Sequence, residues 1–231
     1  MERRRNYKQF CGLARALDRV GERWTLLVVR NLLLGPKRYS DLLESLPGIT
    51  TNLLAARLRE MERLGLVTKR AAQPPVRATL YELAPAGRAL EPALMELARW
   101  GGRFMDQPTQ GDTLDIGWAL LSLKRRYRGG SKLVAELVVD GRSFELVLDA
   151  AYLTVTEGAA TRPDVSVRGP RDAIRAWLFL GRDSGALRSE GALSVNGSET
   201  AWQALSTAFA PREASAEEVA SRGSAHGSAS S

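Results

Sequence analysis

The sequence predicts an α+β protein of two domains, on three observations. The chain has 231 residues, long for one compact domain and sufficient for two that each bury a core. Apolar residues follow a helical period in the first half, whereas runs in the second half alternate every two residues. Charge is uneven, because residues 1–105 hold 19 Lys and Arg against 10 Asp and Glu, and residues 106–231 hold 14 against 16. We therefore expect a basic domain at 1–105, a linker at 106–112 and a second domain at 113–210.

Composition narrows the class of protein. The single cysteine, Cys11, excludes an internal disulfide framework and fits a reducing compartment. The basic N-terminus is followed by further charges rather than by the apolar core of a signal peptide, and the longest apolar run is too short to span a bilayer. We expect a cytoplasmic protein without membrane insertion, whose basic half meets a polyanionic partner.

Helical spacing and stop signals predict the first elements in order. Apolar residues mark helices over residues 10–20 and 24–34, and the second of these stops at Gly35 and Pro36. Ser40 is expected to cap a third, short helix, SDLLESL. A long helix follows the next Pro-Gly turn.

This fourth helix has an unusual outer face. Thr50 or Thr51 caps it, and Gly65 ends it. Leu54, Leu58 and Met61 form its inward stripe. Small, polar and basic residues face outward: Asn52, Ala55, Ala56, Arg59 and Arg63.

Two β-type runs follow, LVTKRA and RATLYELA, separated by the turn-rich AQPPV, and a last helix covers about residues 85–105. Two short helices around a turn, followed by a hairpin, describe a winged helix-turn-helix. In that fold the second helix of the pair enters the DNA major groove, which accounts for its slim outer face. The alternative is an amphipathic helix with an ordinary solvated face. We expect double-stranded DNA as the partner.

Four motifs occur in order within residues 7–105: GERWT, GPKRYSDL, PGIT and RLREMERLGLV. Together they resemble HxlR-type transcriptional regulators. The resemblance implies a homodimer on an inverted repeat, with the first and last helices forming the interface. An apolar stripe on the last helix fits that role, although the same stripe is also compatible with an intramolecular core; it comprises Leu90, Leu94, Leu97, Trp100 and Phe104.

The candidate DNA contacts divide by chemistry. Asn52 is suited to direct readout of adenine, whereas Ala55 and Ala56, where family members carry longer polar side chains, can only lie against thymine methyl groups. Arg57, which matches a basic position of the family's helix, and Arg59 are expected to hold phosphate. The alternative for each basic residue is a solvated surface charge. The remaining candidates are Lys37, Arg38, Thr50, Thr51, Lys69, Arg70 and Arg77.

Cys11 lies where many members of the resembled family have a cysteine, which in some of them senses electrophiles or oxidants. Lys8 and Arg15 are placed to lower the pKa of its thiol. We favour the alternative of a small, buried, inert residue near the dimer interface, because no second cysteine is present to resolve a sulfenic acid.

The second half predicts a sheet with helices on one face. LVAELVV and RSFELVLD alternate across Asp140-Gly141, a strong hairpin signal, and YLTVTEG, PDVSVRG and GALSVNG add further strands. Helices are expected around LDIGWALLSLKRRY, RDAIRAWLFLG and ETAWQALSTAFA. We expect an α+β domain with an antiparallel sheet of about five strands. Residues 211–231 are expected to be a disordered tail.

LxVDGxxFxL, PDVSVRG, LFLG and GALSVNGS occur in this order and resemble the sterol-carrier-protein type 2 superfamily over residues 113–210. The resemblance implies that an apolar small molecule is held between the sheet and the helix at 171–180. The alternative is a packing or dimerisation module. The predicted pocket wall comprises Phe144, Ile174, Trp177, Leu178 and Trp202.

The chain offers few groups for catalysis. Its only histidine, His226, lies in the predicted tail, so no triad or zinc site forms with the one cysteine, and no P-loop occurs. We therefore expect no enzyme activity, no metal and no cofactor. We favour a DNA-binding regulator that acts as a dimeric repressor and responds to an apolar small molecule bound in its second domain. Two alternatives remain: a constitutive DNA-binding protein with a structural second domain, and a lipid carrier with a vestigial DNA module. The basic first half counts against the carrier.

Overall fold

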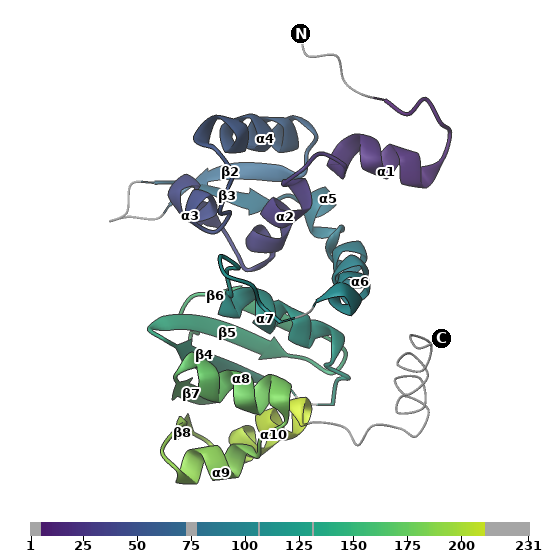
Figure 1. The fold of residues 1–231 in the computed structure, drawn as a ribbon. Helices are drawn as coiled ribbons and strands as arrows, with labels where there is room; N and C mark the ends of the chain where they lie inside the picture. The colour runs from purple at the N-terminus through teal and green to yellow at the C-terminus, as the bar shows by residue number, and fades with distance from the viewer. Residues whose placement is uncertain (1–5, 73–77, 106, 131, 211–231) are drawn as a thin grey trace, which may run out of the picture.

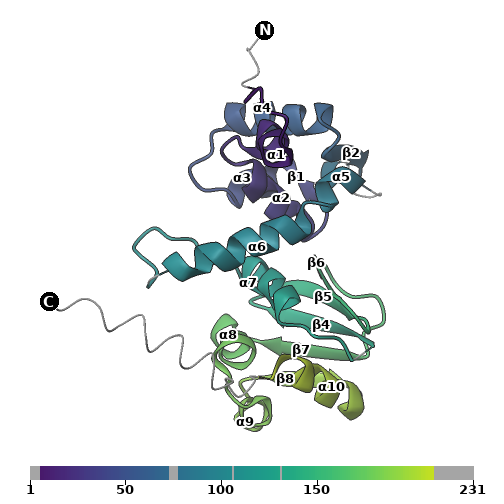
Figure 2. The same ribbon diagram turned by 90° about the vertical axis from the view of Figure 1, so that its right-hand side faces the viewer.

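A computed structural model describes residues 6–72, 78–105, 107–130 and 132–210. They form two bodies stacked end to end, with helix α4 (Thr51–Arg63) at one end and α9 (Ser184–Ser189) at the other (Figures 1 and 2). The predictions for Arg77, His226 and a tail at 211–231 lie outside the described residues. Within the described residues, no helix has the length and apolar character needed to cross a membrane.

The N-terminal body is a winged helix-turn-helix, as predicted. Its three strands form an antiparallel sheet in the order β1-β3-β2. The short strand β1 was not expected from the sequence. The elements are α1 (Gly12–Val20), α2 (Thr25–Leu33), β1 (Lys37–Arg38), α3 (Tyr39–Glu44), α4, β2 (Val67–Ala71), β3 (Thr79–Leu83), α5 (Pro85–Arg88), α6 (Glu91–Gly101) and the 3-10 turn η1 (Gly102–Phe104).

Two predicted helix boundaries are wrong, each for a local reason. The expected single helix at 85–105 is divided into α5, α6 and η1. The break between α5 and α6 occurs because Pro92 lacks the N–H that would continue α5 and is placed in the first turn of α6. Ser40 does not cap α3. Pairing of β1 with β3 extends through Arg38, which is the N-cap residue, and the Arg38 N–H donates to the Asp41 carboxylate over 3.0 Å.

The C-terminal body is an α+β domain with five strands in the order β6-β5-β4-β7-β8. The hairpin at Asp140-Gly141 is confirmed, since both residues have positive φ and Val139 pairs with Arg142. The elements are α7 (Ile116–Ser122), the 3-10 turn η2 (Leu123–Arg125), β4 (Leu133–Val139), β5 (Arg142–Leu148), β6 (Leu153–Glu157), β7 (Val165–Gly169), α8 (Arg171–Leu180), α9, β8 (Ser194–Gly197) and α10 (Glu199–Phe209).

The expectation of an antiparallel sheet is wrong, because the sheet is mixed. β7 runs parallel to β4, with Ala135 opposite Val165 and Val139 opposite Gly169. A tight hairpin turn fixes strand direction, whereas residues 158–164 carry the chain from edge strand β6 past β5 and β4 to the far side. Nothing in such a connecting segment specifies the direction of the next strand.

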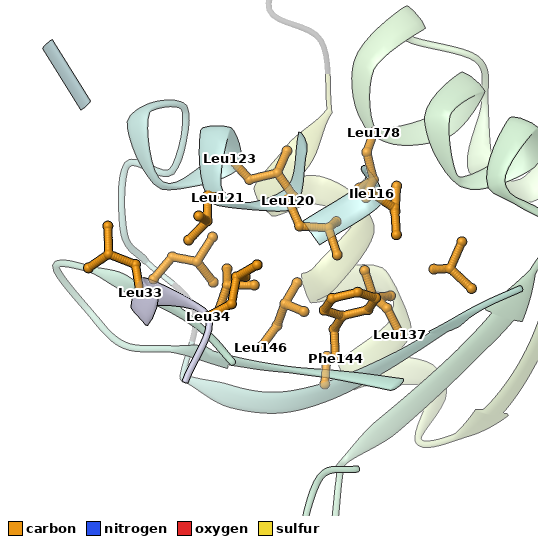
Figure 3. Close-up of a cluster of buried hydrophobic side chains, with 14 of the residues drawn as sticks. Leu33, Leu34, Ile116, Leu120, Leu121, Leu123, Leu137, Phe144, Leu146 and Leu178 are labelled. Carbon is orange, nitrogen blue, oxygen red and sulfur yellow. The ribbon is translucent and has the colours of Figure 1, made fainter. Parts of the chain in front are cut away.

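One buried apolar cluster runs through both bodies. Leu33 and Leu34, at the end of α2, lie beside Leu120 and Leu121 of α7 and Leu146 of β5 (Figure 3). Leu34 is only 2% exposed. The N-terminal body and the C-terminal body therefore pack against each other through a shared core rather than only through the chain that links them.

Candidate nucleic-acid interface

The turn before α4 is fixed by local contacts. Gly48 has a φ of +89°, which favours glycine, and a Cβ placed there would lie 3.7 Å from the Trp24 ring. The Thr50 hydroxyl accepts from the Leu53 N–H over 3.3 Å, which confirms Thr50 as the cap. The Tyr39 hydroxyl donates to the Thr51 carbonyl over 2.6 Å and so joins α3 to the start of α4.

The inward stripe of α4 is confirmed, since Leu54, Leu58 and Met61 are all buried. The stripe leaves a solvent-facing surface, which we call the α4 face: Thr51, Asn52, Leu53, Ala56 and Arg59. Leu53 was missed in the sequence analysis, although its position outside the apolar stripe was a usable signal. Among the described residues, neither Asn52 nor Arg59 forms a side-chain hydrogen bond or ion pair, so both present their full bonding capacity to solvent.

Arg57 does not join the α4 face. Its side chain is 14% exposed, and its guanidinium lies 3.4 Å from the Glu22 carboxylate in the loop between α1 and α2. Ala55 is also partly covered. Arg57 therefore ties α4 to the preceding loop, and Glu22, its partner, was not singled out by the sequence.

The other basic candidates lie either near the α4 face, on α3 and on the β2–β3 hairpin that forms the wing, or on the side of the domain that meets the C-terminal body. Lys69 and Arg70 on β2 are exposed and pair with Glu62 at 2.7 Å and with Glu82 at 2.9 Å. Arg38 is exposed at the N-terminus of α3. Lys37 is instead directed at the C-terminal body, where it forms an ion pair with Glu157. It is thus separated from the α4 face.

Large apolar side chains are exposed on the first and last helices of this body. Trp100 at the end of α6 and Phe104 in η1 form an edge-to-face pair with ring centroids 4.9 Å apart. Helix α6 projects sideways from the junction of the two bodies (Figure 2). Leu94 faces inward and is buried. The exposed set is Phe10, Leu13, Leu17, Leu97, Trp100, Phe104 and Met105. Leu97, Trp100 and Phe104 of the predicted stripe are therefore not part of an intramolecular core, which was the alternative for that stripe.

Cys11 is exposed, not buried, in the single chain. It occupies the N-cap position of α1. The backbone N–H groups of Ala14 and then Leu13 lower the pKa of its thiol. The cause is the open end of the helix rather than the charges of Lys8 and Arg15.

The predicted pocket wall is fully buried. Figure 3 shows Phe144 of β5 on the sheet side of α7 and Leu178 of α8 beside that helix, whereas Trp177 and Trp202 pack on each other with centroids 5.2 Å apart. Ile174 is also completely buried. Across the described ranges, no group of three or more His, Cys, Asp and Glu side chains is placed to hold a metal ion.

These features place the protein in the class of winged helix-turn-helix proteins. The second helix of the helix-turn-helix pair, α4, is exposed. A family model described as HxlR-like helix-turn-helix matches residues 19–109. The chain is 36% identical over 97 residues to the uncharacterized HTH-type transcriptional regulator YkvN of Bacillus subtilis, covering 42% of this chain and 82% of YkvN. It is 33% identical over 100 residues to the HTH-type transcriptional regulator YodB of the same organism, covering 43% and 86%. The chain belongs to the HxlR family.

One further sequence relative and one solved structure are also similar to this chain. A Mycobacterium tuberculosis relative, the uncharacterized HTH-type transcriptional regulator MT3179, is 38% identical over 96 residues, which is 42% of this chain and 60% of that protein. The solved reduced form of YodB is 28% identical with a TM-score of 0.38, covering 44% of this chain and all of that one. The family match ends at residue 109, so the resemblance of residues 113–210 to sterol carriers stays a prediction.

Proposed function

We propose that this chain is a cytoplasmic, dimeric repressor that binds an inverted-repeat operator in double-stranded DNA through α4. The observation that carries the proposal is the α4 face, a capped helix surface on which Asn52 and Arg59 have no partner among the described residues. An Asn side chain can bond adenine through two hydrogen bonds in the major groove, and an Arg side chain can hold a phosphate. Small neighbours such as Ala56 allow close approach of the helix to the bases.

The dimer is supported by the apolar surface of α1 and α6. A monomer rarely keeps several large aromatic and aliphatic side chains exposed together, and a second copy would cover them. Two-fold symmetry would place two α4 helices on one face of the duplex, with half-site centres ~10 bp apart.

We further propose that the C-terminal body holds an apolar small molecule that modulates operator binding. The support is the resemblance to a lipid-holding superfamily and the aromatic pair Trp177–Trp202 between two helices. A constitutive regulator with a purely structural second domain is the alternative. Native mass spectrometry of gently purified protein, with tryptophan fluorescence titration against fatty acids and aromatic compounds, separates them. No bound mass and no titration response would leave the constitutive regulator.

The DNA-binding proposal is tested by footprinting the purified protein on the DNA upstream of its own gene and by selection from a random duplex library. Protection or enrichment of an inverted repeat supports it. Failure to enrich any sequence, at a salt concentration where the protein also ignores random duplex, contradicts it.

A further inference from the structure

Residues 34–37, which we call the corner segment, join α2 to the helix-turn-helix and also contact the C-terminal sheet. The Glu157 N–H donates to the Leu34 carbonyl over 2.7 Å. Glu157 ends β6, the edge strand of the five-stranded sheet. The N–H at the end of this edge strand therefore forms a backbone hydrogen bond to the N-terminal body, of the kind that a neighbouring strand would form.

Two glycines allow this approach. A Cβ on Gly117 of α7 would lie 2.7 Å from Leu34 Cδ1, so α7 comes as near to the corner segment as a glycine permits. Gly35 has a φ of +113°, and a Cβ there would lie 3.1 Å from the Thr156 methyl group. The contact is close-packed on both sides, which leaves little room for the two bodies to slide.

A chain of alternating charges crosses the same contact. Lys37 pairs with Glu157, which also accepts from Arg142 over 2.8 Å, and Arg142 reaches Asp115 at 2.6 Å. Burial alone would raise the pKa of the Glu157 carboxyl, but hydrogen bonds from Arg142 and Lys37 outweigh it and lower that pKa. Asp115 in turn caps α7 by accepting from the Trp118 N–H. The charges thus join β1 to α7, the first helix of the C-terminal body.

Trp118 makes a second attachment, to α2. Its indole N–H donates to Asn31 Oδ1 over 2.9 Å, and the Arg30 guanidinium stacks 3.5 Å from its ring centroid. Asn31 is 3% exposed. Burial lowers the pKa of Arg30 to about 10, partly opposed by Asp115. Both the end of α2 and the start of β1 are therefore held by the C-terminal body.

The corner segment leads directly into the DNA-binding elements. Lys37 and Arg38 form β1, Arg38 is the N-cap of α3, and the Tyr39 hydroxyl bonds the start of α4. The C-terminal body lies at the end of the molecule opposite α4 (Figures 1 and 2), so it does not cover the α4 face. Any influence of that body on α4 within one chain has to pass through contacts such as these.

We propose that the corner segment is a latch through which the C-terminal body sets the orientation of α3 and α4, with Glu157 as its positioning residue. The inference rests on the proposed DNA-binding function. It also reassigns Lys37 from the DNA surface to the contact between the two bodies. A ligand that shifts β6 would change operator affinity by changing this contact.

The test compares Glu157→Gln with Glu145→Gln, the same substitution on the neighbouring strand β5. Hydrogen exchange at residues 34–39 should become about tenfold faster in Glu157→Gln and stay at the wild-type rate in the control, because a local contact is lost without global unfolding. Operator affinity should fall about 5- to 10-fold, within the usual range of coupling between sites, with an unchanged salt slope because no phosphate contact is removed. Trp118→Phe deletes the indole donor to Asn31 and should likewise speed exchange and weaken operator binding. It replaces Glu157→Gln as the test variant if Glu157→Gln does not fold.

A double-mutant cycle separates the latch from a direct DNA contact. If Lys37 acts through Glu157, Lys37→Gln combined with Glu157→Gln should bind the operator no more weakly than either single variant. Additive losses, with a smaller salt slope in Lys37→Gln, would overturn the latch and return Lys37 to the DNA. Equal exchange rates in Glu157→Gln, Trp118→Phe and wild type would also overturn it. If the wild type bound no selected duplex, the proposed function would fail, and the exchange rates would still decide whether the corner is latched.

Discussion

Basic side chains at the two ends of the helix-turn-helix are used in opposite ways. On the α4 face, Arg59 is exposed and has no ion-pair partner among the described residues, whereas at the corner segment Lys37 is paired with Glu157 and partly covered. Both belong to the same basic half of the chain. A positive charge that is exposed and unpaired is more available to a polyanion than one that is partly covered and bonded to a carboxylate. The distribution of partners, not the count of charges, therefore distinguishes the proposed DNA-binding surface from the rest of the basic half.

The largest effect on operator affinity should come from breaking the proposed dimer, which holds two copies of the α4 face together. Replacing Leu97 and Phe104 together with Ser removes apolar surface that the proposed dimer buries. Sedimentation should show monomer with helical circular dichroism retained, and operator affinity should fall by about 10²-fold or more because binding becomes monovalent. Leu180→Ser, at an exposed leucine of the C-terminal body, is the control and should remain dimeric. A dimer that survives the double substitution would place the interface elsewhere.

Removing the Asn52 side chain, the proposed base-reading group, should have the next largest effect on operator binding. Asn52→Ala should relax preference at one base pair per half-site at a cost of about 1–3 kcal/mol, while binding to random duplex stays unchanged. Competition binding against operators substituted at each position measures this. Unaltered preference at every position would remove Asn52 from the reading surface.

Arg59 and Arg57 sharpen the comparison within α4 itself. Arg59→Ala should weaken operator and random duplex alike and reduce the salt slope by about one per protomer. Arg57→Ala should instead reduce stability and alter the salt slope less, since its partner is Glu22. Affinities measured over a salt series distinguish the two. Equal slope changes would show that Arg57 leaves Glu22 to contact phosphate.

The smallest effect should be on the free energy of unfolding at acid pH, through the Glu157 ion pairs beside the corner segment. Because the pKa of Glu157 is lowered in the folded protein, its contribution to the free energy of unfolding is present above its unfolded pKa of about 4.3 and is lost as pH falls through the lower folded value. Urea denaturation at pH 6 and at about pH 3.5 should show a smaller acid-induced loss in Glu157→Gln than in wild type. Glu145→Gln should keep the wild-type loss, and an equal loss in all three proteins would contradict the ion-pair assignment.

Features set by nearby residues could be predicted from the sequence. The apolar stripe of α4, its cap at Thr50 and the Asp140-Gly141 turn each depend on residues a few positions apart. The direction of β7 and the partner of Lys37 could not be predicted, because both depend on segments brought together only by the fold. Position 157 lies 120 residues from Lys37, and no local pattern joins them.

The most direct test selects binding sites from a random duplex library in parallel with wild type, Asn52→Ala and Lys37→Gln. The account predicts that wild type and Lys37→Gln enrich the same inverted repeat with half-site centres ~10 bp apart, while Asn52→Ala loses preference at one symmetric pair of positions. A motif altered by Lys37→Gln and preserved by Asn52→Ala would contradict it, because the corner segment rather than the α4 face would then be reading the DNA.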